Sequence, residues 1–344
     1  MPVLLIPAIT ILFAFAFTFT NGFQDASSVA ATFIASRSAS PRQGILFVAV
    51  MDFLGAILGG SAVALTISGL LVLPPDEDLV LVILVALVAA AAWNITTWHY
   101  GLPSSSTHAL VGGLVGAGIA AAGLESVTWG VAELVIPPHQ LTGLVKILVF
   151  LVLSVLIGFL GGYAMRKTTR ILLRNSKRSV NRDLVRLNWI AAGLMGFSNG
   201  ANDGQKQMGV IALVLFAAGL SATTEVPLWA RIGCAIMLTA GTLGGGWRIM
   251  ATLGRRIFRV DPVHSFDSQL SSGAVIALST ASGAPISSTH VITTSILGVG
   301  AAENRLKVRW SVGKQIVITM LVTIPVTLVI AAFLYMIVSS LTGG

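Results

Sequence analysis

Long apolar runs separated by short polar segments make up most of this chain of 344 residues. A helix needs about 20 apolar residues to span a bilayer, and seven runs approach or exceed this length. They lie at residues 3–20, 44–73, 79–97, 142–165, 187–220, 228–250 and 313–341. Only 10% of the residues are charged and the mean hydropathy is +0.89, whereas a soluble domain carries about 25% charged residues. The pattern predicts an all-α polytopic membrane protein.

The net charge of +8 reflects the loops between these runs. Basic residues gather in four groups, at residues 37–42, 166–186, 248–259 and 305–314. Because Lys and Arg near the ends of spans mark cytoplasmic loops, we expect all four groups inside, and the acidic connections and both chain termini outside. The acidic connections carry Asp76, Glu77, Asp78, Glu125, Glu133 and Glu225. Membrane topology accounts for the charge, so no nucleic-acid partner is expected.

Two motifs each occur twice in the chain. The stretch "NGFQDASSVA" from Asn21 returns as "NGANDGQKQM" from Asn199. The stretch "SSTH" that ends at His108 returns ending at His290, and the two motifs are displaced along the chain by nearly the same distance. Self-similarity of this kind indicates two halves built to the same design.

The halves comprise residues 1–165 and 187–344, joined by the basic cytoplasmic linker 166–186. Each half is expected to contain three full spans and one re-entrant hairpin, at about 79–123 and 269–302, where at least one arm is shorter than a span. Two full spans in place of the first hairpin would satisfy the loop charges equally, but its second arm is short and rich in glycine. Three spans being an odd number, the halves are inverted. Inverted repeats are typical of secondary transporters, which bind substrate near the bilayer midplane.

Consecutive hydroxyl groups stand at both hairpin tips. The first N–H groups of the helix that follows each tip need hydrogen-bond partners inside a membrane, and serine is a good N-cap, so helix capping alone would explain either tip. Because the two tips also present the positive ends of two helix dipoles, we expect them to form one anion site. The expected anion ligands are Ser105, Ser106, Thr107, Ser287, Ser288 and Thr289.

Asp25 and Asp203 interrupt apolar runs, and carboxylates inside a membrane usually line a functional path. A bound anion beside carboxylates requires cations, either protons or a hard cation such as sodium, which suits oxygen ligands. The expected coupling-cation residues are Asp25, Asp203, Asn21, Gln24, Asn199 and Asn202. Lys206 stands on the same helix face as Asp203, so an ion pair is the alternative explanation there, and it would supply one cation permanently. Asp25 has no such neighbour and is expected to take up the travelling cation, with a proton favoured because burial favours the neutral carboxyl.

Three further residues are candidates for the same site. Asp52 lies in an apolar run and either lines the same cavity or reaches the interface near Arg42. His108 and His290 follow the hydroxyl clusters and could carry protons, but a helix N-terminus disfavours a charged imidazole. Hydrogen bonding to the opposite arm of the hairpin is therefore the favoured explanation for both histidines.

The repeated motifs resemble those of the inorganic phosphate transporter (PiT) family. "NGFQD" and "NGAND" match its duplicated signature, and "GLPSSSTHALVGG" and "GAPISSTHVITTSILG" match its duplicated hairpin motif. The chain looks most like the bacterial low-affinity phosphate transporters, for which the resemblance implies proton coupling and carriage of phosphate partly as a neutral metal complex. It also implies that the hairpin hydroxyls bind phosphate and that Asp25 and Asp203 belong to the coupling site. Gln24 stands where the family usually has Asn, and Gln269 where many members have Glu, which weighs against sodium coupling.

These observations predict a secondary active transporter that imports inorganic phosphate by cation symport, in a bacterial inner membrane. The alternatives are a sodium-coupled phosphate or sulfate symporter and an oxyanion channel, which would not need the two aspartates. No enzymatic activity and no cofactor are expected: Ser106 and His108 are two apart on a helix and point away from each other. Sodium at the coupling-cation residues is the metal to consider, and a homodimer is compatible with the sequence.

Overall fold

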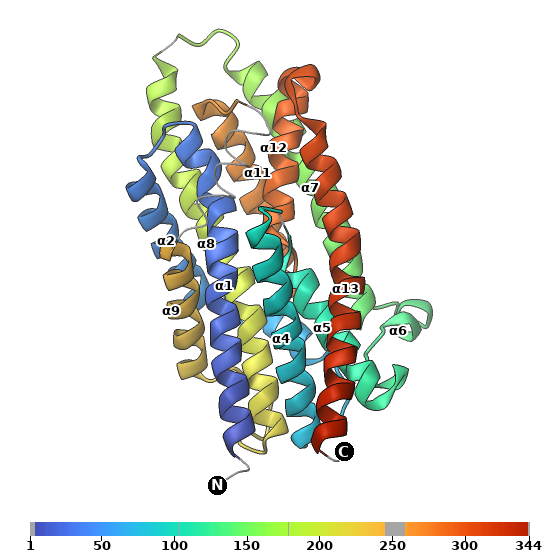
Figure 1. Cartoon of the computed structure of the whole chain (residues 1–344). Coiled ribbons are helices and arrows are strands. Elements are labelled where there is room, and N and C mark those ends of the chain that lie inside the picture. Colours follow the sequence, from blue (N-terminus) through green and yellow to red (C-terminus); the bar gives the residue numbers. More distant parts are fainter. Residues whose placement is uncertain (1–3, 103, 178, 245–258, 343–344) are drawn as a thin grey trace.

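The computed structural model describes residues 4–102, 104–177, 179–244 and 259–342. These residues form a bundle of helices that run along roughly one axis, with both chain termini at the same end of the bundle (Figure 1). No β-strand occurs within the described ranges. Five of the described helices are long and apolar enough to cross a membrane. The predicted all-α membrane class is therefore confirmed.

The helices follow the apolar runs in order along the chain. Their bounds are α1 Leu5–Ala35, α2 Pro41–Leu58, α3 Ala62–Ser68, α4 Glu77–His99, α5 Ser106–Ala122, α6 Val131–Val135, α7 Gly143–Leu172, α8 Val180–Ala217, α9 Leu228–Gly244, α11 Pro262–Ala281, α12 Ser288–Asn304 and α13 Trp310–Thr342. Two short 3₁₀ turns, Leu124–Ser126 and Arg305–Lys307, complete the regular structure of the described chain.

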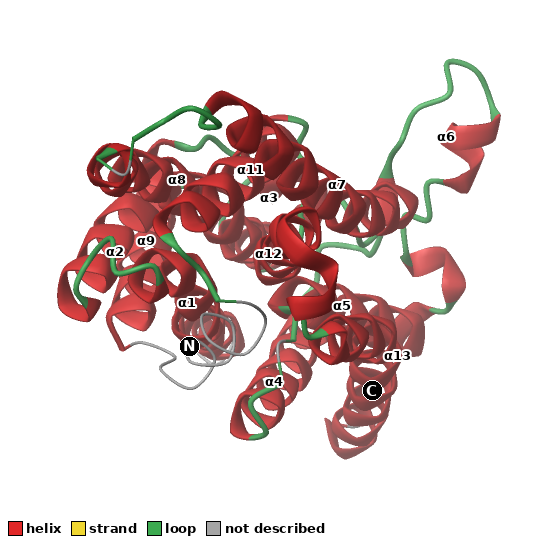
Figure 2. Cartoon of the chain, turned by 90° about the horizontal axis from the view of Figure 1, so that it is seen from above, coloured by secondary structure: helices red, strands yellow, loops and turns green. Residues whose placement is uncertain are grey.

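Four long helices carry the chain from one end of the bundle to the other. α1, α7, α8 and α13 contain 31, 30, 38 and 33 residues, and at about 1.5 Å per residue each is longer than the roughly 30 Å of a bilayer core. α1 and α7 run away from the end that holds both termini, whereas α8 and α13 run toward it (Figure 1). Seen along the bundle, α12 lies near the centre and α6 projects to one side (Figure 2).

Two helix pairs, α4 with α5 and α11 with α12, enter the bundle from opposite ends (Figure 1). The turns that join them, residues 100–105 and 282–287, end in buried residues. The two turns meet inside the bundle, because the Thr107 hydroxyl donates a hydrogen bond of 2.8 Å to the carbonyl of Ile286. Pro103, which lies in the first of these stretches, is outside the described residues.

The sequence predicted a single span at residues 44–73, and this prediction is wrong. α2 ends at Leu58, and the separate helix α3 begins at Ala62. Gly60 adopts a φ of 85°, a left-handed conformation that glycine tolerates and that ends the α-helical path. The apolar side chains continue through the break, so hydropathy alone does not reveal it.

The second hairpin is longer than predicted, since α11 begins at Pro262 rather than near residue 269. Asp261 and His264 form a capping box at its start, with proline in the first turn, and both features favour helix initiation. The helices also extend into the predicted linker 166–186, because charged Lys and Arg are good helix formers beyond the apolar stretch. α7 continues to Leu172, and α8 begins at Val180.

Glycines bring the inner helices of both hairpins close to their neighbours. A Cβ atom at Gly116 of α5 would lie 2.2 Å from the carbonyl oxygen of Leu328 in α13, and one at Gly298 of α12 would lie 2.0 Å from that of Phe159 in α7. Only a residue without a side chain permits such backbone contact, which is typical of helix packing in membranes. The close contacts fix α5 against α13 and α12 against α7.

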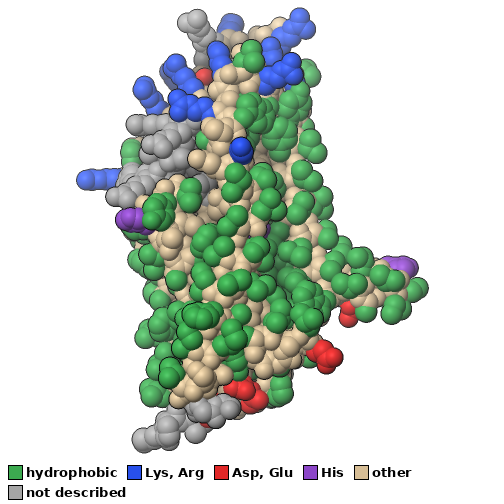
Figure 3. Space-filling view, turned by 45° about the vertical axis from the view of Figure 1, so that its right-hand side comes forward, with side chains coloured by type: hydrophobic (Ala, Val, Ile, Leu, Met, Phe, Trp, Pro, Cys, Tyr) green, Lys and Arg blue, Asp and Glu red, His purple; other side chains and the backbone are tan. Residues whose placement is uncertain are grey.

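Charged side chains are divided between the two ends of the bundle. In the face shown in Figure 3, Lys and Arg gather at one end and Asp and Glu at the other, with a hydrophobic surface between them. The basic end is opposite to the termini (Figure 1). Of the third predicted basic group, residues 248–258 lie outside the described part of the chain. The distribution matches the charge pattern expected of a membrane protein.

Candidate functional site

The two hairpin tips meet the middle of α1 and α8, where Asp25 and Asp203 lie. The helices after both tips are capped by serine: Ser105 Oγ accepts from the backbone N–H of His108 at 3.2 Å, and Ser287 Oγ accepts from that of His290 at 3.4 Å. These caps satisfy one exposed donor of each helix, as the sequence predicted. The next hydroxyls along each tip remain for other partners.

Asp25 of α1 receives hydrogen bonds from both hairpins. Ser106 of α5 donates to Asp25 Oδ2 at 3.3 Å, and Thr289 of α12 donates to Asp25 Oδ1. The hydroxyl oxygens of Ser28 and Thr289 lie 3.3 Å apart. All four side chains are buried, with no residue more than 3% exposed. Within the described residues, Asp25 has no ion-pair partner.

Asp203 of α8 has a different set of partners. Ser288 of α12 donates to Asp203 Oδ2 at 3.0 Å, and the Lys206 ammonium donates to Oδ1. The same ammonium donates to the Thr107 hydroxyl and to the Ile286 carbonyl, each at 2.7 Å. The expected ion pair between Asp203 and Lys206 is therefore present, and Lys206 also contacts both hairpins.

The amides of the second half position other groups. Asn202 donates to Thr280 Oγ1 at 2.9 Å and to the Ala284 carbonyl at 3.2 Å, and its Oδ1 accepts from Ile286 N at 3.3 Å. Three bonds of this kind hold the second tip, so Asn202 acts on the tip in this conformation rather than as a free cation ligand.

Asp52 lies in α2 and is fully buried. Asn199 donates to Asp52 Oδ1 at 3.1 Å, and Thr242 of α9 donates to Oδ2 at 3.0 Å. Of the two explanations open for Asp52, extension to the membrane interface is therefore wrong. The carboxylate belongs to the polar interior, linked through Asn199 to the helix that carries Asp203.

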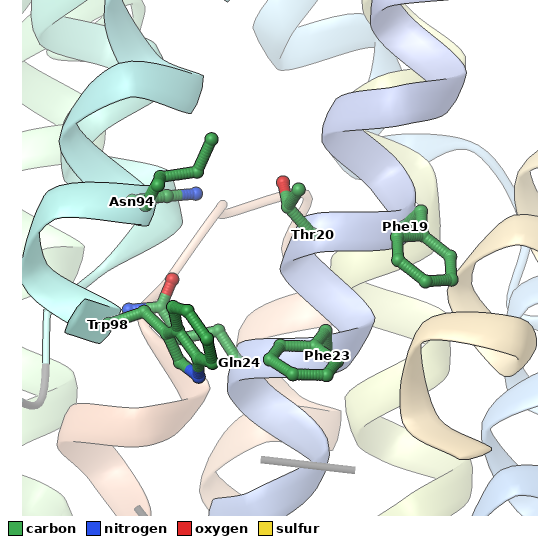
Figure 4. A pocket seen from close by; sticks show the side chains of 7 residues that line it. Phe19, Thr20, Phe23, Gln24, Asn94 and Trp98 are labelled. Atoms are coloured by element: carbon green, nitrogen blue, oxygen red, sulfur yellow. The ribbon is translucent and has the colours of Figure 1, made fainter. Parts of the chain in front are cut away.

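The amides of the first half face a different environment. Asn21, one turn before Asp25 on α1, is fully buried, and neither side-chain polar atom has a hydrogen-bond partner among the described residues. Gln24 lines a cavity of about 200 Å³ between α1 and α4. The side chains of Asn94, Thr20 and Gln24 reach toward the gap between these helices (Figure 4). Its lining residues are Phe19, Thr20, Phe23, Gln24, Asn94, Ile95 and Trp98.

The rings of the two tip histidines contact each other. The rings of His108 and His290 are 5.2 Å apart between centroids, in a T-shaped arrangement. Neither ring nitrogen of His108 has a hydrogen-bond partner among the described residues, so hydrogen bonding to the opposite arm is wrong for His108. The tips meet through their first helical turns, and this brings the two rings together. Gln269 lies deeper in α11, where it donates to Ser265 Oγ at 3.3 Å.

Several residues of the site were missed by sequence reasoning. Ser28, Thr242 and Thr280 are single hydroxyls in otherwise apolar helices, and they bond to their own helix as readily as to a distant partner. Asn94 could have been identified from the sequence, because burying an amide in an apolar run costs free energy and therefore indicates a functional position. A cluster of charged side chains at the basic end of the bundle was also not predicted from the sequence.

This second cluster joins α7 to both arms of the second hairpin. Arg166 Nε donates to Glu303 Oε2 at 2.7 Å, and Thr169 donates to Asp267 Oδ2 at 2.8 Å. Arg166 also reaches Asp267 at 3.5 Å. Because the cluster lies at the helix ends, it holds the hairpin at its base and leaves the tip to the residues described above.

Buried carboxylates and two polar tips inside a bundle of helices long enough to span a membrane are typical of membrane transporters. The sequence profile described as "Phosphate transporter family" matches residues 21–189 and 176–331. The chain therefore belongs to the phosphate transporter family, as the motifs indicated.

Relatives and a solved structure agree with this assignment. The chain is 37% identical over 343 residues to a "Probable low-affinity inorganic phosphate transporter" of Bacillus subtilis (strain 168), covering 98% of this chain and 99% of the relative. It is 36% identical to a protein of the same description from Rhizobium meliloti (strain 1021), covering 93% and 92%. A solved structure described as "The sodium-dependent phosphate transporter" is similar with a TM-score of 0.82 at 25% identity, covering 97% of this chain and 99% of that chain. The relatives are described as transporters and not as enzymes.

Proposed function

We propose that this protein imports inorganic phosphate across the bacterial cytoplasmic membrane by cation symport, with two inverted repeats and both termini outside. The observation that carries the proposal is that the carboxylates of Asp25 and Asp203 accept hydrogen bonds from hydroxyls of the hairpin tips. The proposed phosphate ligands and the proposed cation ligands thus contact each other directly.

This contact supplies a mechanism of coupling. A hydroxyl group has a single proton to donate, so Ser106 and Thr289 can donate to Asp25 or to phosphate, but not to both. While Asp25 is ionised, it accepts a hydrogen bond from each of them. A cation or proton that neutralises Asp25 weakens these charge-assisted bonds and releases the hydroxyls for phosphate. Cation binding and phosphate binding then favour each other.

Phosphate would be held between the tips by their hydroxyls and backbone N–H groups. The proposed ligands are Ser105, Ser106, Thr107, Ser287, Ser288 and Thr289, all buried. The N-termini of α5 and α12 both point to this region, and each contributes a positive dipole end. Two such ends and several donors suit a tetrahedral oxyanion.

The carboxylates favour phosphate over sulfate. At neutral pH inorganic phosphate retains at least one O–H group, which can donate to a carboxylate, whereas sulfate has none. A sulfate beside the carboxylate of Asp203, which pairs with the Lys206 ammonium, would place lone pairs against lone pairs, and an unmatched polar group in a buried site is rejected strongly. The names of the relatives, which refer to phosphate, support the same choice.

A proton is the proposed coupling ion, with sodium second. Asp25 is buried without an ion-pair partner in the described part of the chain, and burial of this kind favours the protonated carboxyl. The hydroxyls of Ser28, Ser106 and Thr289 around Asp25 would also suit sodium, and the similar solved structure is described as sodium-dependent. A channel would need neither ion, because it has no use for a carboxylate that controls the tips.

Uptake of labelled phosphate into proteoliposomes tests the proposal, with proton and sodium gradients imposed separately and sulfate as competitor. Asp25→Asn is expected to abolish accumulation against a gradient and to leave downhill phosphate exchange measurable, because Asn retains an acceptor for the hydroxyls but takes up no proton. Asp183→Asn, an exposed carboxylate at the basic end, is the control. Accumulation by Asp25→Asn with unchanged pH dependence would contradict the role of Asp25, and uptake indifferent to both gradients would indicate a channel.

A further inference from the structure

The Lys206 ammonium occupies the centre of the bundle, where its side chain is only 1% exposed. It donates to Asp203 Oδ1, Thr107 Oγ1 and the carbonyl oxygen of Ile286. An ammonium has three N–H donors, and all three are used. The three acceptors belong to α8, to α5 and to the turn before α12, so one charge ties both hairpins to one long helix.

Alignment of the repeated motifs identifies the residue of the first half that corresponds to Lys206. When "NGFQDASSVA" from Asn21 is aligned with "NGANDGQKQM" from Asn199, Asp25 corresponds to Asp203 and Ser28 corresponds to Lys206. When the two "SSTH" stretches of the tips are aligned, Thr107 corresponds to Thr289. The arrangement of Asp25, Ser28 and Thr289 therefore corresponds to that of Asp203, Lys206 and Thr107, and in each case the hairpin of the opposite half supplies the threonine.

These corresponding groups differ in one respect. Around Asp25, Thr289 of the opposite half donates directly to the carboxylate and lies 3.3 Å from the hydroxyl of Ser28. Around Asp203, the Lys206 ammonium stands between the carboxylate and the hydroxyl of Thr107 from the opposite half, and it contacts both. Its neighbours are a carboxylate, a hydroxyl and a backbone carbonyl, which are the ligands that a hard cation takes in proteins.

We propose that the Lys206 ammonium is a tethered cation. It occupies the position next to Asp203 that corresponds to the cation site at Asp25, so that Asp203 binds no mobile cation. The inference rests on the proposed coupling function and assigns the mobile cation to Asp25 alone of the two. The tethered charge neutralises Asp203 throughout the transport cycle. Because it does not leave with phosphate, it contributes nothing to accumulation. Removal of the amine opens a place for a small monovalent cation between Asp203, Thr107 and Ile286.

Sodium binding to variants tests this assignment. Lys206→Ser places in the second half the residue type that Ser28 provides in the first half. It is made in an Asp25→Asn background, which removes the proposed cation site at Asp25. The purified double variant is expected to show a saturable rise in melting temperature of a few degrees with sodium chloride relative to choline chloride, because a ligand that binds only the folded state stabilises it. Asp25→Asn alone is the control and is expected to show no such rise.

Two further variants make the result specific. Adding Asp203→Asn to the double variant is expected to remove the sodium effect, since the carboxylate ligand is lost. Lys206→Met in place of Lys206→Ser fills the space without a charge and is expected to show no sodium effect. The proposal would be overturned if the Lys206→Ser protein folds but its melting temperature does not change with sodium at alkaline pH, where protons compete least with sodium.

An exchange of the two side chains retains one central ammonium if Lys206→Ser alone does not fold. Ser28→Lys with Lys206→Ser is expected to transfer the gradient dependence of phosphate uptake from Asp25 to Asp203, so that Asp203→Asn now abolishes accumulation. Dependence that stays with Asp25 in this variant would refute the tethered cation. Absence of phosphate uptake by the wild-type protein would instead refute the proposed function, and the sodium-dependent melting temperature would still decide the role of Lys206.

Discussion

Replacement of Ser106 and Ser288 by alanine together is expected to weaken phosphate binding strongly. In the structure Ser106 Oγ donates to Asp25 at 3.3 Å and Ser288 Oγ donates to Asp203 at 3.0 Å. Both residues are buried, with 3% and 1% exposure. In the phosphate complex each hydroxyl is expected to turn from its carboxylate to the anion.

The magnitude follows from the charge of the acceptor. A hydrogen bond to a charged group contributes about 1.5–3 kcal/mol, and about 1.4 kcal/mol is a tenfold change in affinity. The two hydroxyls lie on different hairpins but share one ligand, so their effects are not strictly additive. The double variant is therefore expected to raise the Kd for phosphate by at least roughly 100-fold.

Calorimetric titration of purified protein with phosphate measures this change. The helix caps Ser105 and Ser287 are intact in the double variant, so near-normal folding is expected. Ser295→Ala is the matched control, because Ser295 is a buried hydroxyl of α12 that donates to the Ser268 carbonyl at 3.1 Å, away from the tips. A Kd in the double variant equal to that of Ser295→Ala would show that the tip hydroxyls serve only the protein fold.

Two further predictions concern topology and packing. In a cysteine-free background, Arg174→Cys is expected to react with an impermeant thiol reagent only from the cytoplasmic side and Asp76→Cys only from outside, and the reverse pattern would overturn the proposed orientation. Gly116→Ala is expected to destabilise the protein by about 1–3 kcal/mol or more, because its Cβ would lie 2.2 Å from the Leu328 carbonyl. Gly313→Ala, which meets only a flexible side chain, should melt as the wild type does.

Much of the fold could be predicted from the sequence, because membrane insertion depends on apolar length. The apolar runs anticipated the long helices, and the repeated motifs anticipated both turns. The break after Leu58 could not be predicted, since the turn at Gly60 leaves the apolar pattern uninterrupted. The start of α11 at Pro262 was missed for the opposite reason: its capping signals lie in a polar segment that hydropathy does not register.

The candidate site was less accessible to sequence reasoning. The ion pair of Asp203 with Lys206 could be predicted because both residues stand on one helix face. The contact of Lys206 with Thr107 could not, because it depends on how two hairpins from opposite ends meet. The same holds for Thr242 and Asp52, whose hydrogen bond joins α9 to α2. Local spacing determines partners within a helix, whereas partners between helices follow from packing.

The exchange of partners between the halves bears directly on coupling. Thr289, from the second half, donates to Asp25 of the first, and Thr107, from the first half, reaches Asp203 of the second through Lys206. A cation that binds at Asp25 therefore alters a bond made by the hairpin of the other half. If each carboxylate bonded only to its own hairpin, neutralising it would leave the opposite hairpin unaffected. Because the bonds cross between the halves, a local change of charge at Asp25 acts on both tips, which is what a site that binds phosphate and a cation together requires.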